Sequence, residues 1–220
     1  EAILQAGKAY SNEFLFIFDH AYLLHDFLPS ATQTPIWELA QSTGADDQAA
    51  VFCSFSKVTF GGGGLSFATA GKKLFDLLVR QRASMIVCPD KVNQMRHLEF
   101  LKDKAGVLEH MQKHADIVRP KFEVAFDALD VLSPEIGNYQ KPTGGYFISY
   151  DAKRPIAKRV IELCKESGVL ITPAGSPNPH FHDPLDSNIR LAPTFLETED
   201  LKDAMEVFVT AIILAHQELD

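Results

Sequence analysis

The sequence is poor in positive charge: its 220 residues include 21 lysines and arginines against 29 aspartates and glutamates, for a net charge of −8. Nucleic-acid phosphates are bound by a basic face, so nucleic acid is not expected as a partner of this segment. Apolar runs are short, and none approaches the roughly 18 residues that suggest a membrane span. The opening residues show no basic segment followed by an apolar core, so no signal peptide is expected.

Cysteine is scarce as well, and its spacing is uninformative for a metal or a disulfide framework. Cys53, Cys88 and Cys164 are odd in number and form no C-x-x-C pair. This favours reduced thiols and a cytoplasmic setting, and we interpret Cys53 as a core residue. The pair His180 and His182 has a ligand-like spacing, but no convincing third ligand lies nearby in the sequence. We therefore predict no metal site.

The apolar pattern predicts an α/β fold. Residues 14–18 form a continuous apolar run between polar neighbours, which is typical of a strand buried on both faces of a helix-covered parallel sheet. A short helix near residues 35–40 and a second strand at 50–54 would complete a βαβ unit. Residues 65–70, after a run of glycines, are predicted to form a third strand.

Helical spacing dominates the middle of the chain. Residues 72–87, 91–101 and 105–129 carry apolar side chains three and four positions apart. Pro120 lies inside the last of these segments and is expected to kink or interrupt the helix. Because long kinked helices often join domains, we predict a first domain that ends at residue 120.

The second predicted domain comprises residues 121–220, where strands and helices are mixed. Alternating apolar residues at 146–150 predict a half-buried strand, and residues 188–192 predict another. Thr198 is expected to start a closing helix, because acidic side chains follow it in the first turn.

The most informative stretch is Cys53-Ser-Phe-Ser-Lys-Val-Thr-Phe-Gly-Gly-Gly-Gly-Leu65, in which Lys57 directly follows a predicted strand. We expect this lysine to leave bulk water for a cavity, where its amine is available for Schiff-base chemistry. Ser54 and Ser56 offer hydroxyls, and the glycines let backbone N–H groups approach an anion. A surface turn with a solvated lysine is the alternative.

Polar side chains at the end of the first predicted strand point to the same chemistry. Asp19 and Tyr22 lie where α/β sheets bind their ligands. A carboxylate there can keep a pyridine nitrogen protonated, and a phenol can hydrogen-bond a ring oxygen. The alternatives are an aspartate that caps the loop and a tyrosine whose ring lies in the core.

Arg190 interrupts an otherwise apolar strand, Asn188-Ile-Arg-Leu-Ala192. Burying an unpaired guanidinium is expensive, so this side chain needs an anionic partner. Its planar fork suits a substrate α-carboxylate, which it can bind through two hydrogen bonds. An internal salt bridge to one of the many aspartates or glutamates is the alternative.

The order of these motifs resembles that of fold-type I pyridoxal 5'-phosphate (PLP)-dependent aminotransferases. The resemblance runs from about Phe14 to the end of the chain and adds a Pro-x-Gly-Gly-x-Phe match at residues 142–147. Within that family, the sequence looks closest to a bacterial aspartate aminotransferase-like subgroup, often called MocR-like. This second likeness is carried by Ser56–Phe67, Asp90–Met95 and Arg190–Pro193.

The resemblance implies a role for each residue singled out above. Lys57 would bind PLP as a Schiff base and move a proton on the substrate, Asp19 would pair with the pyridine nitrogen, and Tyr22 would pair with the ring oxygen. Ser54 would bind the cofactor phosphate, and Arg190 would clamp the substrate α-carboxylate. The reaction would be transamination between an amino acid, aspartate or another acidic one, and a 2-oxo acid, in a homodimer.

The resemblance also implies an architecture. Residues 1–120 would be the carboxy-terminal part of the PLP-binding large domain, with a mostly parallel sheet, and residues 121–220 an α+β small domain. Two features depart from the family pattern. Gly64 stands where most relatives have a phosphate-binding arginine, and the family's amino-terminal half has no counterpart here. We therefore expect the chain to be a carboxy-terminal half that is inactive alone.

Other readings stay open at this point. A MocR-type transcriptional regulator carries a PLP-binding effector domain of the same fold, and β-elimination or decarboxylation can run on the same scaffold. The residue that would hold a substrate side-chain carboxylate is not identified among Arg80, Arg82 and Lys91. His20 and His25 flank the proposed site, and either could contact the substrate.

Overall fold

The computed structural model describes residues 1–28 and 34–220, which form a mixed α/β fold, as predicted. The described residues divide into two compact units. Unit 1 comprises residues 1–26 and 34–112, and unit 2 comprises residues 27–28 and 113–220. The assignment of residues 1–120 and 121–220 to a large and a small domain stays a prediction.

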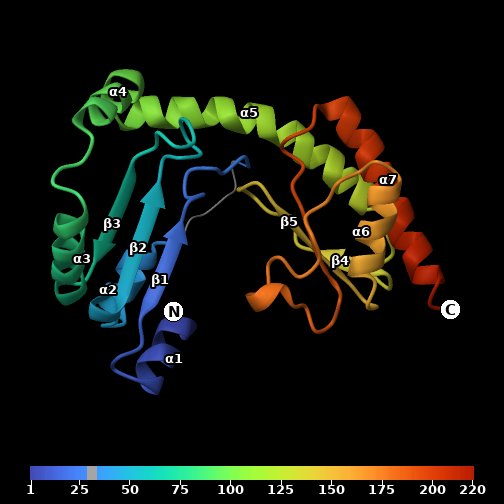
Figure 1. The fold of residues 1–220 in the computed structure, drawn as a ribbon, viewed down its shortest axis with the longest axis horizontal. Coiled ribbons are helices and arrows are strands. Elements are labelled where there is room, and N and C mark those ends of the chain that lie inside the picture. The colour runs from blue at the N-terminus through green and yellow to red at the C-terminus, as the bar shows by residue number, and fades with distance from the viewer. Residues whose placement is uncertain (29–33) are drawn as a thin grey trace. The chain divides into compact units, whose positions relative to one another are not determined.

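Unit 1 is built on a three-stranded sheet of β1 (Phe16–His20), β2 (Ala49–Ser54) and β3 (Ser66–Ala70), which lie side by side in Figure 1. β1 and β2 run parallel with a helix between them, as the predicted βαβ unit requires, but β3 is antiparallel to β2. This differs from a mostly parallel sheet. The connecting segment, residues 55–65, is too short for a parallel crossover, which takes a dozen or more residues.

Helices precede, connect and follow the strands of this sheet, and the first two of them pack against one of its faces. They are α1 (Ala2–Tyr10), α2 (Ile36–Ser42), the 3-10 turn η1 (Asp46–Gln48), α3 (Lys72–Met85) and α4 (Lys91–Leu101). A small core joins α1, β1 and α2, and in it the ring of Phe16 packs against Gly7 so closely that any Cβ there would overlap it. Gly7 therefore lets α1 and β1 approach.

The other side of the sheet in unit 1 is open. Ile17 in β1 is 65% exposed and Phe67 in β3 is 50% exposed. The prediction of a strand at residues 14–18 buried on both faces is therefore wrong in two respects: the strand begins at Phe16, and only one of its faces is covered by described residues. An apolar run indicates a strand, but it does not say whether both faces find a partner.

Unit 2 contains an antiparallel sheet of β4 (Gly137–Tyr139), β5 (Ile148–Ala152) and β6 (Asn188–Leu191). Its remaining elements are α6 (Ala157–Glu166), the 3-10 turn η2 (Pro179–Phe181), α7 (Thr198–Gln217) and the second part of α5 (Lys104–Leu129), whose first residues belong to unit 1. In Figure 1, α6 and α7 lie side by side.

Pro120 does not interrupt α5, which is helical from Lys104 to Leu129. Proline removes one backbone hydrogen bond and strains the preceding turn. The turns that follow Pro120 are held by packing, because Phe122 and Ala125 are fully buried. Tertiary burial thus overrides the local effect of the proline.

The core of unit 2 is continuous and joins all of its longer elements. It includes one face of α7, on which Leu201, Met205, Phe208, Ile212 and Ala215 are buried. The other large side chains that are fully buried come from α5, the sheet and α6: Phe122, Leu129, Ile148, Tyr150, Ile156, Ile189, Val160 and Cys164. No helix in the described part of the chain is long and apolar enough to cross a membrane.

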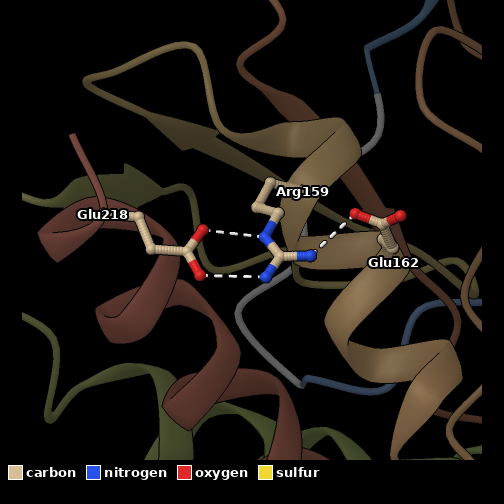
Figure 2. A network of polar contacts seen from close by, with 3 residues as sticks. All are labelled: Arg159, Glu162 and Glu218. Atoms are coloured by element: carbon tan, nitrogen blue, oxygen red, sulfur yellow. Dashed lines mark hydrogen bonds and ion pairs between the residues drawn. The ribbon is translucent and has the colours of Figure 1, made fainter.

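A surface network fastens the end of α7 to α6 (Figure 2). Arg159 donates from Nε and Nη2 to the two carboxylate oxygens of Glu218, at 2.7 and 2.9 Å, and from Nη1 to Glu162 at 2.7 Å. The guanidinium holds the pKa of Glu218 below its ordinary value. Because these groups are solvated, the network orders the helix end more than it stabilises the fold.

Candidate active site

The predicted site residues of unit 1 lie at the ends of two neighbouring parallel strands or in the segments that follow them. In the register of β1 and β2, Asp19 lies opposite Phe52 and His20 lies opposite Cys53. Parallel strands end at the same edge of a sheet, which is where such sheets bind ligands. The segments that carry Tyr22 and Lys57 therefore leave the sheet at one edge, although 34 residues separate them in the sequence.

Lys57 and Tyr22 are brought together there. The Lys57 Nζ atom lies 5.0 Å from the centroid of the Tyr22 ring, within the range of a cation–π contact. The expectation that Lys57 leaves bulk water is not met, because its side chain is exposed. The described residues cover one face of the sheet and leave this edge open to solvent. Tyr22 is half-buried, so its ring is not a full member of the core.

Asp19 lies at the surface at the end of β1, and one of its oxygens caps the following turn. Its Oδ1 accepts a hydrogen bond of 3.1 Å from the backbone N–H of Ala21. The loop-capping alternative is therefore observed, while Oδ2 has no hydrogen-bond partner among the described residues. Burial and then the negative charge of Asp19 raise the pKa of the Cys53 thiol, which fits Cys53 as an unreactive neighbour.

Ser54 and Ser56 form a compact cluster of polar groups after β2. The Ser54 hydroxyl donates to Ser56 Oγ at 2.8 Å and accepts from the Ser56 backbone N–H at 3.1 Å. Gly64 packs directly against them: a Cβ there would lie 2.5 Å from the Ser56 nitrogen and 2.6 Å from its Cα. Backbone atoms cannot yield as a flexible side chain can, so this conformation admits only glycine at position 64.

This packing explains one departure from the family pattern. An arginine at position 64 would need a Cβ where the backbone of Ser56 lies. An anion at this turn would therefore meet hydroxyls and backbone N–H groups rather than a guanidinium from position 64. Such groups suffice for a phosphate when they are convergent.

Arg190 belongs to β6 of unit 2 and is half-buried. Its guanidinium carbon lies 4.8 Å from the centroid of the Phe147 ring, in the Pro-x-Gly-Gly-x-Phe segment. Among residues 1–28 and 34–220, no carboxylate forms an ion pair with Arg190, and its buried Nε has no hydrogen-bond partner. The internal salt bridge considered above is therefore not found, and the donor can serve an anion from outside.

The residues present fit a phosphate-bearing pyridine aldehyde. Lys57 offers an exposed amine, Ser54 and Ser56 offer donors beside a glycine, and Asp19 keeps one carboxylate oxygen for a cation. They do not fit a metal: within the described residues, no group of three or more His, Cys, Asp or Glu side chains is arranged to hold one.

Sequence reasoning missed the residues that hold the Lys57 segment. His25, considered above as a substrate contact, is only 5% exposed and bonds to the backbone oxygen of Lys57. Two other histidines, His97 and His110, contact the next two residues. Their positions are separated by tens of residues, and no local pattern links them to Lys57.

Comparison with known proteins identifies the family. Residues 2–219 match the family model described as aspartate amino-transferase. The aspartate aminotransferase of Corynebacterium glutamicum is 34% identical over 218 residues, which cover 98% of this chain and 50% of that protein. The chain thus spans about half the length of the curated relatives it matches.

Solved structures agree in fold. The crystal structure of an aspartate transaminase from Corynebacterium glutamicum has a TM-score of 0.91 and 32% identity, covering 99% of this chain and 53% of that one. The alpha-aminoadipate aminotransferase LysN of Thermus thermophilus, solved with N-(5'-phosphopyridoxyl)-L-leucine, has a TM-score of 0.77 at 24% identity, covering 98% and 54%. At that identity the second likeness concerns the fold alone.

A more distant relative is not named as an enzyme. The HTH-type transcriptional regulator NorG of Staphylococcus aureus is 25% identical over 161 residues, covering 72% of this chain and 35% of the regulator. The match to the family model extends over nearly every residue, and the enzyme relatives are more similar and more completely covered. This chain belongs to the aspartate amino-transferase family.

Proposed function

We propose that the protein containing this chain transfers an amino group between an amino acid and a 2-oxo acid, with PLP bound covalently at Lys57. The observation that carries the proposal is the approach of the Lys57 amine to the Tyr22 ring at the common edge of β1 and β2. Family membership implies PLP dependence and this reaction class. When bound, PLP supplies an aldehyde that captures amines and a pyridine ring that accepts electrons.

Each residue of unit 1 contributes a distinct task in this proposal. Lys57 would hold the cofactor and would carry a proton to and from the substrate carbon, as a general base must be mobile and within reach. Asp19 would pair with the pyridine nitrogen through Oδ2, the oxygen that does not cap the turn. Tyr22 would donate to the ring oxygen, and Ser54 would donate to the phosphate.

Arg190 binds the substrate in this proposal. Its buried Nε lacks a partner among the described residues, and its guanidinium rests on the Phe147 ring, which fixes the plane of the fork. A substrate α-carboxylate would give that donor its partner through two hydrogen bonds. Such clamping orients the substrate carbon for proton transfer.

We further propose an acidic amino acid, aspartate foremost, as the amino donor. The support is the resemblance to the MocR-like subgroup and the relative from Corynebacterium glutamicum, which is named an aspartate aminotransferase. The order of the motifs also supports this chain as the carboxy-terminal half of the enzyme. Its relatives are about twice as long. The family resemblance supports a homodimer, and the three scattered cysteines favour a cytoplasmic setting.

An absorbance titration with PLP tests the covalent link. The wild-type protein should gain a band near the edge of the visible range, and Lys57→Ala should lose it while keeping its circular dichroism. Lys73→Ala, which removes an exposed lysine of the same unit, should keep the band. A band that persists in Lys57→Ala would reject Lys57 as the attachment point.

Product analysis tests the reaction and the substrate class. Aspartate and 2-oxoglutarate should yield oxaloacetate and glutamate, whereas β-elimination or decarboxylation would give other products. Arg190→Lys should raise KM for the amino acid, because a lysine cannot replace the two-pronged contact. Formation of alanine from aspartate would instead indicate decarboxylation.

A regulator with a PLP-binding effector domain is the second candidate, favoured by the likeness to NorG. The two functions differ in a direct measurement. A regulator would bind a specific DNA sequence with an affinity that changes on adding PLP or an amino acid, and it would turn over little substrate. Steady turnover of aspartate without specific DNA binding supports the enzyme.

A further inference from the structure

Three histidines contact three consecutive residues directly after β2. His25 Nε2 lies 3.1 Å from the carbonyl oxygen of Lys57, and His110 Nε2 lies 2.7 Å from that of Val58. His97 Nε2 lies 2.9 Å from the hydroxyl of Thr59. The histidines come from three separate parts of unit 1: the segment after β1, α4, and the first turns of α5.

The chemistry of the partners fixes how two of these histidines bond. A carbonyl oxygen only accepts, so His25 and His110 must each carry a proton on Nε2 and donate it. His97 contacts the carbonyl oxygen of Asn93 through Nδ1 at 2.9 Å, so its Nδ1 is the donor. Nε2 of neutral His97 is then an acceptor, and the single Thr59 hydroxyl proton has two acceptors within reach, His97 Nε2 at 2.9 Å and the carbonyl oxygen of Phe55 at 3.1 Å.

Burial makes these contacts matter. His25 and His97 are 5% and 4% exposed, and they are two of the three buried polar or charged residues among those described. A buried imidazole without hydrogen bonds is costly, so each is expected to keep its contact. Val58, which lies between Lys57 and Thr59, is 1% exposed, so its buried side chain also anchors the loop.

Local hydrogen bonds shape the same loop. The backbone N–H groups of Val58 and Thr59 both donate to the carbonyl oxygen of Phe55, each at 3.0 Å. The segment therefore forms a tight turn whose residues on both sides of Lys57 are held. Only the Lys57 side chain extends outward, and the direction of its Cα–Cβ bond follows from the backbone that the histidines hold.

His25 also connects this loop to the Tyr22 segment. Its ring meets the Tyr22 ring edge-on with centroids 5.5 Å apart, and its backbone N–H donates to the Tyr22 carbonyl oxygen at 3.0 Å. One buried side chain thus touches the segment that carries the phenol and the segment that carries the amine. A shift of either segment would have to move His25.

We infer that His25, His97 and His110 are positioning residues that set the orientation of Lys57 relative to Tyr22. The inference rests on the proposed function, in which Lys57 must reach both the cofactor and the substrate carbon. His25 and His110 act through the backbone of the loop and His97 through the Thr59 hydroxyl, and in this inference none of them touches the cofactor or the reacting atoms. Loss of a donor frees the loop and separates the Lys57 amine from the Tyr22 ring.

Competitive acetylation tests the inference without any cofactor. The full chain, purified without PLP, is treated with a trace of acetic anhydride, and the labelling of Lys57 is compared with that of Lys73 by mass spectrometry. While the Lys57 amine is held against the Tyr22 ring, the ring shields it from the reagent. His25→Leu and His110→Leu should therefore speed Lys57 labelling on the order of two- to tenfold, the factor that corresponds to the net free energy of one hydrogen bond. The labelling rate of Lys73 should not change.

Conservative variants separate positioning from packing. Gln places an N–H donor close to where histidine Nε2 lies, so His25→Gln and His110→Gln should return the labelling rate to near the wild-type value. His182→Leu removes an exposed histidine of unit 2 and should have no effect. His110 is half-buried, so its variants serve where a substitution of His25 prevents folding.

The outcomes distinguish this inference from the proposed function. The positioning role would be overturned if Lys57 labelling were unchanged or slower in both Leu variants. If His25→Leu does not fold, the same result in His110→Leu alone would overturn it. A failure of the Gln variants to restore the labelling rate would also overturn it. Absence of a Lys57-dependent PLP band in the wild-type protein would overturn the proposed function. The labelling result would still decide whether the histidines hold the lysine.

Discussion

Units 1 and 2 bury their apolar residues to very different degrees. In unit 2 one continuous core joins α5, α6, α7 and the sheet. In unit 1 the core between α1, β1 and α2 is small, and apolar side chains of β1 and β3 face solvent. The comparison teaches that an apolar run can predict a strand without predicting whether the strand is buried. Strands with apolar side chains are covered by other elements in unit 2 and partly exposed to solvent in unit 1.

The catalytic candidates follow the same division. The residues proposed to hold PLP lie in unit 1, at the edge of its open sheet, while the proposed carboxylate binder lies in unit 2. Unit 2 can keep Arg190 in place with its own core. Unit 1 holds Lys57 mainly through hydrogen bonds from histidines, so its site should be the more sensitive to pH and to single substitutions.

The largest effect is expected in the core of unit 2. Phe208→Ala should cost about 3–5 kcal/mol in the free energy of unfolding, because the ring is fully buried and packs edge-on against Tyr150. Urea unfolding measures it. Phe195→Ala, at a 90% exposed position of the same unit, is the matched control and should change stability little. Equal losses in the two variants would contradict the burial described here.

Gly64→Ala is expected to have the next largest effect, now in unit 1. The new Cβ would meet the Ser56 backbone, and such overpacking costs about 1–3 kcal/mol. Gly61→Ala is the control, because nothing lies within 4 Å of a Cβ there, and it should be neutral or slightly stabilising. Thermal unfolding followed by circular dichroism compares the two, and a neutral Gly64→Ala would show that the turn can rearrange.

The pH dependence of unit 1 should be traceable to His25. Burial, with a smaller contribution from the charge of Lys57, holds the pKa of His25 below its ordinary value of 6.5, although backbone hydrogen bonds and Asp26 oppose the shift. As the pH falls below 6.5, His25 takes up a proton more readily in the unfolded chain than in the folded one, so the folded state loses stability. Above pH 6.5, His25 is neutral in both states, and this loss of stability is absent.

Unfolding measured from pH 8 to pH 5 checks this sign. His25→Gln cannot take up a proton, so the difference in stability between wild type and variant should shift against the wild type as the pH is lowered. Deuterium exchange should place the loss in residues 55–60 rather than in β4–β6. A wild type that gains stability relative to the variant on acidification would contradict the assignment.

The smallest effect is expected at the surface of unit 2. Arg159→Gln breaks the contacts with Glu218 and Glu162 shown in Figure 2. Because these groups are solvated, the free energy of unfolding should barely change. Deuterium exchange at the end of α7 should nevertheless become faster, and Lys202→Gln, which breaks an exposed pair at the start of the same helix, should leave that end unchanged.

Several elements were predictable because their signals are local. The helices predicted at residues 91–101 and 105–129 are confirmed as α4 and α5, because apolar spacing reports the face that a helix buries. The five predicted strands were found to within two residues, but β4 was not predicted, and the first strand is covered on one face rather than on two. Pro120 was expected to kink or interrupt α5, and the helix nevertheless continues through it because packing outweighs one lost hydrogen bond.

The candidate site was predictable in part for a similar reason. Tyr22 and Lys57 follow two parallel strands, and parallel strands end at the same edge of a sheet, so the approach of these two residues could be expected from the sequence. The exposure of Lys57 could not, since it depends on what covers that edge. The three histidines were missed because their contacts join positions 25, 97 and 110 to one loop.

By itself, the sequence indicated most of the helices and strands, the order of the motifs and the family they indicate, because backbone hydrogen bonding and apolar spacing act over a few residues. Only the tertiary structure decided that β3 runs antiparallel, that position 64 admits no side chain, and that histidines hold the lysine loop. Those features arise where distant segments meet, and contact between distant segments is set by the path of the whole chain.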